Sequence, residues 1–202
     1  MALKYRNLIV FDHPYTAAAS ENEPHNRSFT AALCKSITQK LQAKGQLVDI
    51  VDLHADGFDP VMHKEDLVNW RKGIPMNELV ADYQRRMMRA DRIIFMFPIW
   101  WELMPAMTKG FIDKVYAKNI LYTQDERGMR TKLPRSTEVV VVTVMNTPTG
   151  IYKTILGKPI VYAMHRGTFS KTGIAHFKWV PFSGVSNMSP QQRDRLIERA
   201  RV

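Results

Sequence analysis

Five short apolar runs, separated by segments with helical spacing, constrain the fold of this chain more than any other feature. Runs such as NLIVF and RIIFMF are apolar after their first residue, which is typical of strands buried on both faces of a parallel sheet. The run EVVVVTVM is the clearest of them. We therefore predict five strands, at residues 7–11, 47–53, 92–97, 138–145 and 174–182.

Helical spacing fills the intervals between these runs. After the first run, apolar residues recur every four positions from Phe29 to Leu41, behind a serine suited to cap a helix and before a glycine suited to end it. This alternation predicts a single α/β domain over residues 1–202, a doubly wound five-stranded parallel sheet with helices on both faces. The predicted helices lie at residues 28–45, 75–90, 105–116, 152–166 and 190–202, and residues 54–73 are predicted to be loop.

The composition excludes several classes of function. A single cysteine, Cys34, allows neither an intramolecular disulfide nor a Cys-only metal site, and the histidines lack metal-ligand spacing, so we expect no metal. The formal net charge is +10, but the lysines and arginines are spread out, and we do not expect nucleic acid as a partner. No apolar stretch approaches the roughly 20 residues of a membrane span, and we see no signal peptide. We expect a cytoplasmic protein.

Ligands of such sheets bind where the strands end at their carboxyl side, near the point at which the strand order reverses. This rule selects three loops before any motif is considered. They are residues 13–30, 98–104 and 145–152.

The first of these loops ends at a helix start with a basic residue and hydroxyl groups, namely Arg27, Ser28 and Thr30. Free N–H groups and the helix dipole favour a phosphate at such a place. The chain contains neither GxxxxGK[ST] nor GxGxxG, which argues against an ATPase or a dinucleotide Rossmann site. Ordinary helix capping is the alternative explanation.

The second and third loops supply an aromatic wall and polar groups. Trp100 and Trp101 directly follow a predicted buried strand, and at least one of them should line the cleft, although packing beneath a loop or in a subunit contact is the alternative. The amide of Asn146 and nearby backbone N–H groups could bind the polar edge of a ring, unless this loop is an ordinary turn. A phosphate seat, an aromatic wall and donors to a ring edge together match the needs of flavin mononucleotide.

Three stretches of the sequence resemble one known family, the flavodoxin-like NAD(P)H:quinone oxidoreductases, which include DT-diaphorase, the modulator of drug activity proteins and the potassium-efflux ancillary reductases. The stretches are FPIWWELMPAMTKGFIDKVY, VDLHADGFDPVMHKED, and a histidine–proline pair followed by RSFT. The resemblance implies a flavin near three groups of residues and one catalytic tyrosine: His13, Arg27, Ser28, Phe29 and Thr30 at the phosphate; Pro98, Ile99, Trp100 and Trp101 beside the isoalloxazine; Met145, Asn146, Thr147 and Pro148 at the pyrimidine edge; and catalytic Tyr152 near the hydride-accepting ring.

The same resemblance implies an activity and an assembly. It implies two-electron hydride transfer from NAD(P)H, through bound FMN or alternatively FAD, to a quinone or another flat electrophile, in ping-pong fashion and in a homodimer. The chain departs from the family at Pro148, which lacks an N–H donor, and after Tyr152, where no histidine follows and only Lys153 or Lys158 could substitute. A regulatory flavin-binding subunit that docks on a transporter or another protein is the alternative function.

Overall fold

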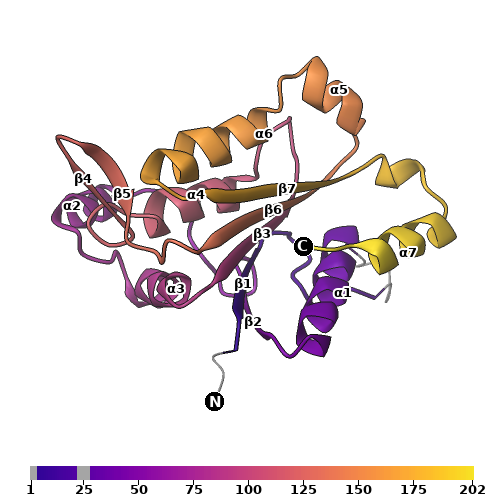
Figure 1. Cartoon of the computed structure of the whole chain (residues 1–202), viewed down its shortest axis with the longest axis horizontal. Helices are drawn as coiled ribbons and strands as arrows, with labels where there is room; N and C mark the ends of the chain where they lie inside the picture. The colour runs from indigo at the N-terminus through magenta and orange to yellow at the C-terminus, as the bar shows by residue number, and fades with distance from the viewer. Residues whose placement is uncertain (1–3, 22–27) are drawn as a thin grey trace.

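The protein is described by a computed structural model that covers residues 4–21 and 28–202. Its centre is a five-stranded, wholly parallel sheet with the strand order β2-β1-β3-β6-β7 (Figure 1). This arrangement confirms the predicted fold class. The strands are β1 (Arg6–Phe11), β2 (Leu47–Asp52), β3 (Arg92–Pro98), β6 (Glu138–Met145) and β7 (His176–Ser183).

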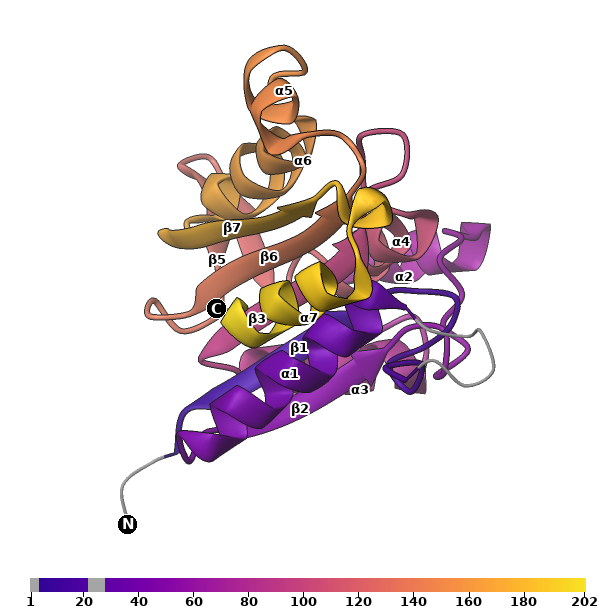
Figure 2. The same ribbon diagram turned by 90° about the vertical axis from the view of Figure 1, so that its right-hand side faces the viewer.

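Helices cover both faces of this sheet (Figure 2). Successive strand residues point to opposite faces, so Ile9 and Phe11 pack toward one side and Leu8 and Val10 toward the other. The first side carries α1 (Phe29–Ala43) and α7 (Pro190–Arg199). The second side carries α3 (Glu78–Met88), α4 (Ala106–Val115) and the π-helical segment η1 (Tyr162–Phe169).

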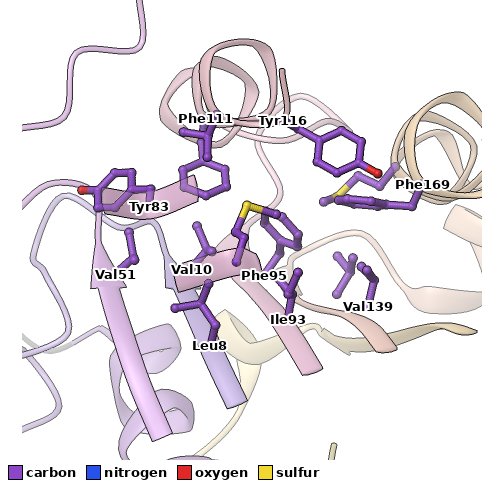
Figure 3. Close-up of a cluster of buried hydrophobic side chains, with 14 of the residues drawn as sticks. Leu8, Val10, Val51, Tyr83, Ile93, Phe95, Phe111, Tyr116, Val139 and Phe169 are labelled. Atoms are coloured by element: carbon purple, nitrogen blue, oxygen red, sulfur yellow. The ribbon is translucent and has the colours of Figure 1, made fainter. Parts of the chain in front are cut away.

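Aromatic rings fill much of the second side (Figure 3). The ring centroid of Phe95 lies 5.9 Å from that of Phe111 and 5.5 Å from that of Phe169. Tyr116 extends the cluster, 5.3 Å from Phe169. Such ring pairs contribute beyond their buried area, and they fix α4 and η1 against the central strand β3.

Serine caps begin two of the helices, and the sequence predicts the first of these caps. The Ser28 hydroxyl accepts a hydrogen bond from the N–H of Ala31 at the start of α1, and Ser189 forms a capping box with Gln192 at the start of α7. These caps set the starting points of the two helices on the same face of the sheet.

The structure corrects three local predictions. The predicted loop at 54–73 contains α2 (Lys64–Lys72), a helix with no buried residue and hence no apolar stripe to detect. A two-stranded hairpin, β4 (Tyr122–Asp125) with β5 (Gly128–Thr131), was not predicted. The predicted helix at 152–166 is divided into α5 (Thr149–Thr154), α6 (Pro159–Val161) and η1.

The break in that last helix has a local cause. Gly157 and Lys158 have φ values of 70° and 55°, which are incompatible with a right-handed helix, and Pro159 lacks the N–H that would continue one. The chain therefore restarts at Pro159, in the first-turn position that tolerates proline.

The stretch VDLHADGFDPVMHKED serves to anchor α4. A Cβ atom on Gly110 would lie 2.4 Å from Pro60, so the loop before α2 rests directly on the helix backbone. Four residues further on, the buried Lys114 ammonium lies 2.9 Å from a carboxylate oxygen of Asp66 and donates to the carbonyl of Val61. These contacts fix α4, whose amino end lies beside the candidate site.

Among the residues that the structure describes, none of the helices has both the length and the apolar character needed to cross a bilayer.

Candidate functional site

A pocket of about 430 Å³ opens between the loops that follow β3 and β6. Pockets for small ligands usually measure roughly 300–1,000 Å³. Six of the residues predicted from the sequence come together in its lining, and Glu102 joins them as a residue that the sequence reasoning missed. The lining consists of Ile99, Trp100, Trp101, Glu102, Met145, Asn146 and Thr147.

The β3 wall of this pocket is a tight two-residue turn. Trp100 and Leu103 exchange two backbone hydrogen bonds, with N···O distances of 3.0 and 3.1 Å. The residues between them, Trp101 and Glu102, have φ values of 48° and 63°. Glycine and asparagine usually occupy such positions, and other residues there cost of order 1–3 kcal/mol each. Surrounding contacts must hold this turn in place.

Tyr152 and Thr147 supply those contacts from the other wall. The Tyr152 hydroxyl donates to the carbonyl of Glu102 over 2.8 Å and accepts from the N–H of Ile160 over 3.1 Å. The Thr147 hydroxyl donates to Glu102 Oε1 over 2.7 Å. Tyr152 is fully buried, and burial raises the pKa of its hydroxyl to about 12. Here Tyr152 joins the two loops, and its catalytic contact with a hydride-accepting ring stays a prediction.

The two tryptophans line the pocket with different exposure. Trp101, at the tip of the turn, is 98% exposed, and Trp100 is 47% exposed. Because the Trp101 ring is exposed to solvent, its burial does not offset the strain of the turn. This arrangement is suited to a ligand or a second protein surface that would cover the ring.

The β6 wall supplies hydrogen-bond donors. The Asn146 side-chain oxygen accepts from the Ser186 hydroxyl over 2.9 Å, so its NH₂ group faces away from that bond. Among the hydrogen bonds between described residues, none uses the backbone N–H of Asn146 or Thr147. Pro148, the next residue, has no N–H. Met145, at the end of β6, is buried and also lines the pocket.

The loop after β1 begins on the neighbouring strand and does not line the 430 Å³ pocket. Ser28 caps α1, Thr30 is buried, and Phe29 packs against Phe182 with centroids 6.2 Å apart. The first turn of α1 has no acidic residue that would repel an anion at its positive end. Pro98, at the end of β3, is buried and does not line the pocket.

Two other predicted residues of this loop need separate mention. His13 is half-buried, its ring nitrogen accepts from the N–H of Tyr15 over 3.1 Å, and burial lowers its pKa. Arg27 lies outside the described residues. The structure therefore leaves the proposed phosphate contacts of both residues as predictions.

Asp12 is a buried connecting residue that the sequence reasoning did not identify. One carboxylate oxygen accepts from the N–H and the hydroxyl of Thr108, over 2.8 and 2.6 Å, and the other lies 3.1 Å from His54 Nε2. It joins the end of β1 to the amino end of α4 and to the loop after β2. Within the described residues, no three His, Cys, Asp or Glu side chains gather as metal ligands.

Comparison with known proteins adds family and sequence relationships. Residues 6–202 match a family described as having a flavodoxin-like fold. A Haemophilus influenzae protein named an uncharacterized NAD(P)H oxidoreductase is 26% identical over 195 residues, which are 96% of this chain and 91% of that protein.

Two further similarities differ in extent. A ribosyldihydronicotinamide dehydrogenase [quinone] of Pongo abelii is 28% identical over 131 residues, which are 57% of this chain and only 52% of that enzyme. The crystal structure of Smu.1420 from Streptococcus mutans has a TM-score of 0.78 and 27% identity, and the match covers 96% of this chain and 95% of that one.

Proposed function

Because this chain belongs to the family with the flavodoxin-like fold, we propose that its 430 Å³ pocket holds the ring of FMN, and that the protein is an NAD(P)H-dependent quinone oxidoreductase. The observation that carries this proposal is the pocket itself, which has tryptophans on one wall and free N–H donors on the other. The names of the relatives, an uncharacterized NAD(P)H oxidoreductase and a ribosyldihydronicotinamide dehydrogenase [quinone], support the same reaction class.

The residues present fit each part of this cofactor. The amino end of α1, with Ser28 and Thr30 and no acidic side chain in its first turn, suits the phosphate. Trp100 and Trp101 suit one side of a flat ring, and the donors of Asn146 and Thr147 suit its polar edge. FMN is the cofactor of this proposal, and FAD is the alternative.

When bound, the flavin supplies the hydride chemistry, and the protein supplies binding, orientation and electrostatics. The tryptophans limit access of water to the ring, and the turn at Trp101 positions them. In this proposal the N–H groups of Asn146 and Thr147 would bind the polar edge of the ring, and such preorganised donors stabilise negative charge that develops there. Tyr152 keeps the two walls in register through its bond to Glu102.

A second copy of the chain would complete the pocket in this proposal. Apolar side chains in the loop after β3 and just after α5 have large exposed surfaces, including Trp101 at 98%, Ile155 at 76% and Leu103 at 47%. A homodimer would cover them and leave room for a substrate slot. A cytoplasmic location is part of the same proposal.

The test is steady-state reduction of quinones by NADH and by NADPH with FMN-loaded protein. We expect a ping-pong pattern, with parallel double-reciprocal lines, because donor and acceptor use one slot in turn. Negligible turnover with a range of quinones would reject the proposal that the protein is a quinone-reducing enzyme. If the protein then still bound FMN and copurified with a partner, the regulatory flavin-binding subunit would be the better account.

A further inference from the structure

One long stretch of the chain carries positive charge without negative charge. Residues 139–193 contain lysines, arginines and histidines but no aspartate or glutamate. The whole chain has 19 acidic residues among 202, so an acid-free stretch of this length is unusual. It forms α5, α6, η1 and β7. A negatively charged ligand that approaches these elements is therefore attracted by them and meets no carboxylate of their own.

The surface of α6 and η1 has a recess of about 180 Å³ within this stretch. Its lining consists of Lys158, Val161, Tyr162, His165 and Arg166. Pockets for whole small ligands usually measure roughly 300–1,000 Å³, so this recess has the size for one part of a ligand. Three of its side chains carry N–H groups that can donate to an anion, and they favour a phosphate group as that part.

These three donor side chains are held in place by rings and by the backbone. The guanidinium of Arg166 lies over the ring of Tyr162, with 4.9 Å to the centroid, and a stacked guanidinium keeps the donors in its own plane free. The ring of His165 stacks on Phe177, with centroids 4.6 Å apart. Lys158 has a φ of 55°, a strained conformation of the kind that clusters at ligand clamps. Among the described residues, no carboxylate pairs with any of the three donors.

The recess is joined to the 430 Å³ pocket through one oxygen atom. The Tyr152 hydroxyl donates to the carbonyl of Glu102, which lines the pocket, and accepts from the N–H of Ile160. Ile160 directly precedes Val161 of the recess, and the N–H of Lys158 donates to the carbonyl of Tyr152 over 2.9 Å. Figures 1 and 2 show α5 and α6 next to each other. A nucleotide with one end in the pocket therefore has the recess beside it.

We propose that this recess binds a phosphate group of the nicotinamide nucleotide that donates the hydride, through Lys158, His165 and Arg166. The proposal rests on the proposed function and adds a subsite for the donor to it. Arginine binds phosphate through two parallel hydrogen bonds, and lysine binds it as a point charge. The donor offers two sources of phosphate, namely the pyrophosphate that NADH and NADPH share and the 2′-phosphate that only NADPH carries.

The experiment measures binding of the oxidised nucleotides, which cannot reduce the flavin. Isothermal titration calorimetry gives the dissociation constants of NADP⁺ and NAD⁺ with FMN-loaded wild type, Lys158→Gln, Arg166→Gln and the control Arg127→Gln. Each substitution removes one positive charge and keeps a long polar side chain. Arg127 is an exposed arginine in the turn between β4 and β5. Circular dichroism and thermal unfolding verify that each variant is folded.

We expect Lys158→Gln and Arg166→Gln each to bind NADP⁺ at least 5-fold more weakly than Arg127→Gln, a difference of about 1 kcal/mol. An equal loss for NAD⁺ identifies the pyrophosphate, and a loss confined to NADP⁺ identifies the 2′-phosphate. Constants equal to those of the control for both nucleotides, or no measurable binding by folded wild type, would overturn the subsite. Reduction of quinones by NADPH with the same wild-type preparation tests the proposed function separately, because turnover together with unchanged constants would overturn the subsite alone.

Discussion

Replacing Tyr152 with phenylalanine removes one oxygen atom that two segments of the chain share. The hydroxyl donates to the carbonyl of Glu102 and accepts from the N–H of Ile160, and both bonds lie inside the protein. The ring itself would keep its contact with Trp179, whose centroid is 5.5 Å away. The substitution therefore tests the two hydrogen bonds with little change in packing.

The expected loss in the free energy of unfolding follows from the two backbone groups that the substitution leaves without a hydrogen-bond partner. The Ile160 N–H is buried and loses its acceptor, while the Glu102 carbonyl loses the donor that helps to hold its strained turn. With roughly 1–3 kcal/mol for a buried group without a partner and about 1 kcal/mol for the second bond, we expect a loss of about 3 kcal/mol in the free energy of unfolding. For a chain of this size that corresponds to a fall in Tm of roughly 6–12 °C.

Urea unfolding followed by circular dichroism measures this loss, and FMN titration measures the effect on the pocket. Tyr162→Phe is the matched control, because Tyr162 is 49% exposed and its hydroxyl has no bond among the described residues. We expect Tyr152→Phe also to weaken FMN binding several-fold, since the turn that carries the tryptophans is less firmly held. A change below about 0.5 kcal/mol, equal to that of the control, would refute the reasoning.

Two further predictions concern the support of α4. Gly110→Ala should lower the free energy of unfolding by roughly 1–3 kcal/mol, because its Cβ would lie 2.4 Å from Pro60. The control Gly150→Ala, whose Cβ would have nothing within 4 Å, should be neutral or stabilising. Equal free energies for the two variants in urea unfolding would contradict this reasoning. Burial alone would raise the pKa of Asp66, but the His63 N–H and Lys114 hold it below its usual value. The ion pair therefore stabilises the protein above about pH 4 and is lost as the pH falls through the lower folded pKa. Asp66→Asn should flatten this acid limb in a pH series of urea midpoints, and an unchanged limb would count against the pair.

The parts of the fold that the sequence could predict are those whose burial leaves a pattern. The inner strands β1, β3 and β6 are buried on both faces, so stretches such as 138–145 are mostly apolar, and the predicted bounds of that stretch agree with β6. Helix α2 buries no residue and the hairpin β4–β5 is short and exposed, so neither has such a pattern. Gly157 and Pro159 were signals for the break in the predicted helix at 152–166, whereas the positive φ of Lys158 is unusual for its residue type.

The candidate site was predicted to the level of loops and not of contacts. The carboxyl-end rule selected the loops after β3 and β6, and two adjacent tryptophans identified the pocket wall. The place of Glu102 in the pocket lining depends on a turn in which two residues other than glycine have positive φ values. The usual residue preferences of such turns argue against tryptophan and glutamate there. Glu102 is a single charged residue in a loop with two tryptophans, and this was the signal in the sequence that could have identified it as a site residue.

The central claim is that this fold encloses a flavin, and identification of a bound chromophore tests it most directly. Purified protein, reconstituted with a mixture of FMN, FAD and riboflavin and then freed of unbound ligand, is denatured, and the released compounds are measured by mass spectrometry. The account predicts FMN at close to one per chain, with much less riboflavin because it lacks the phosphate. Release of no flavin from folded protein would contradict the account.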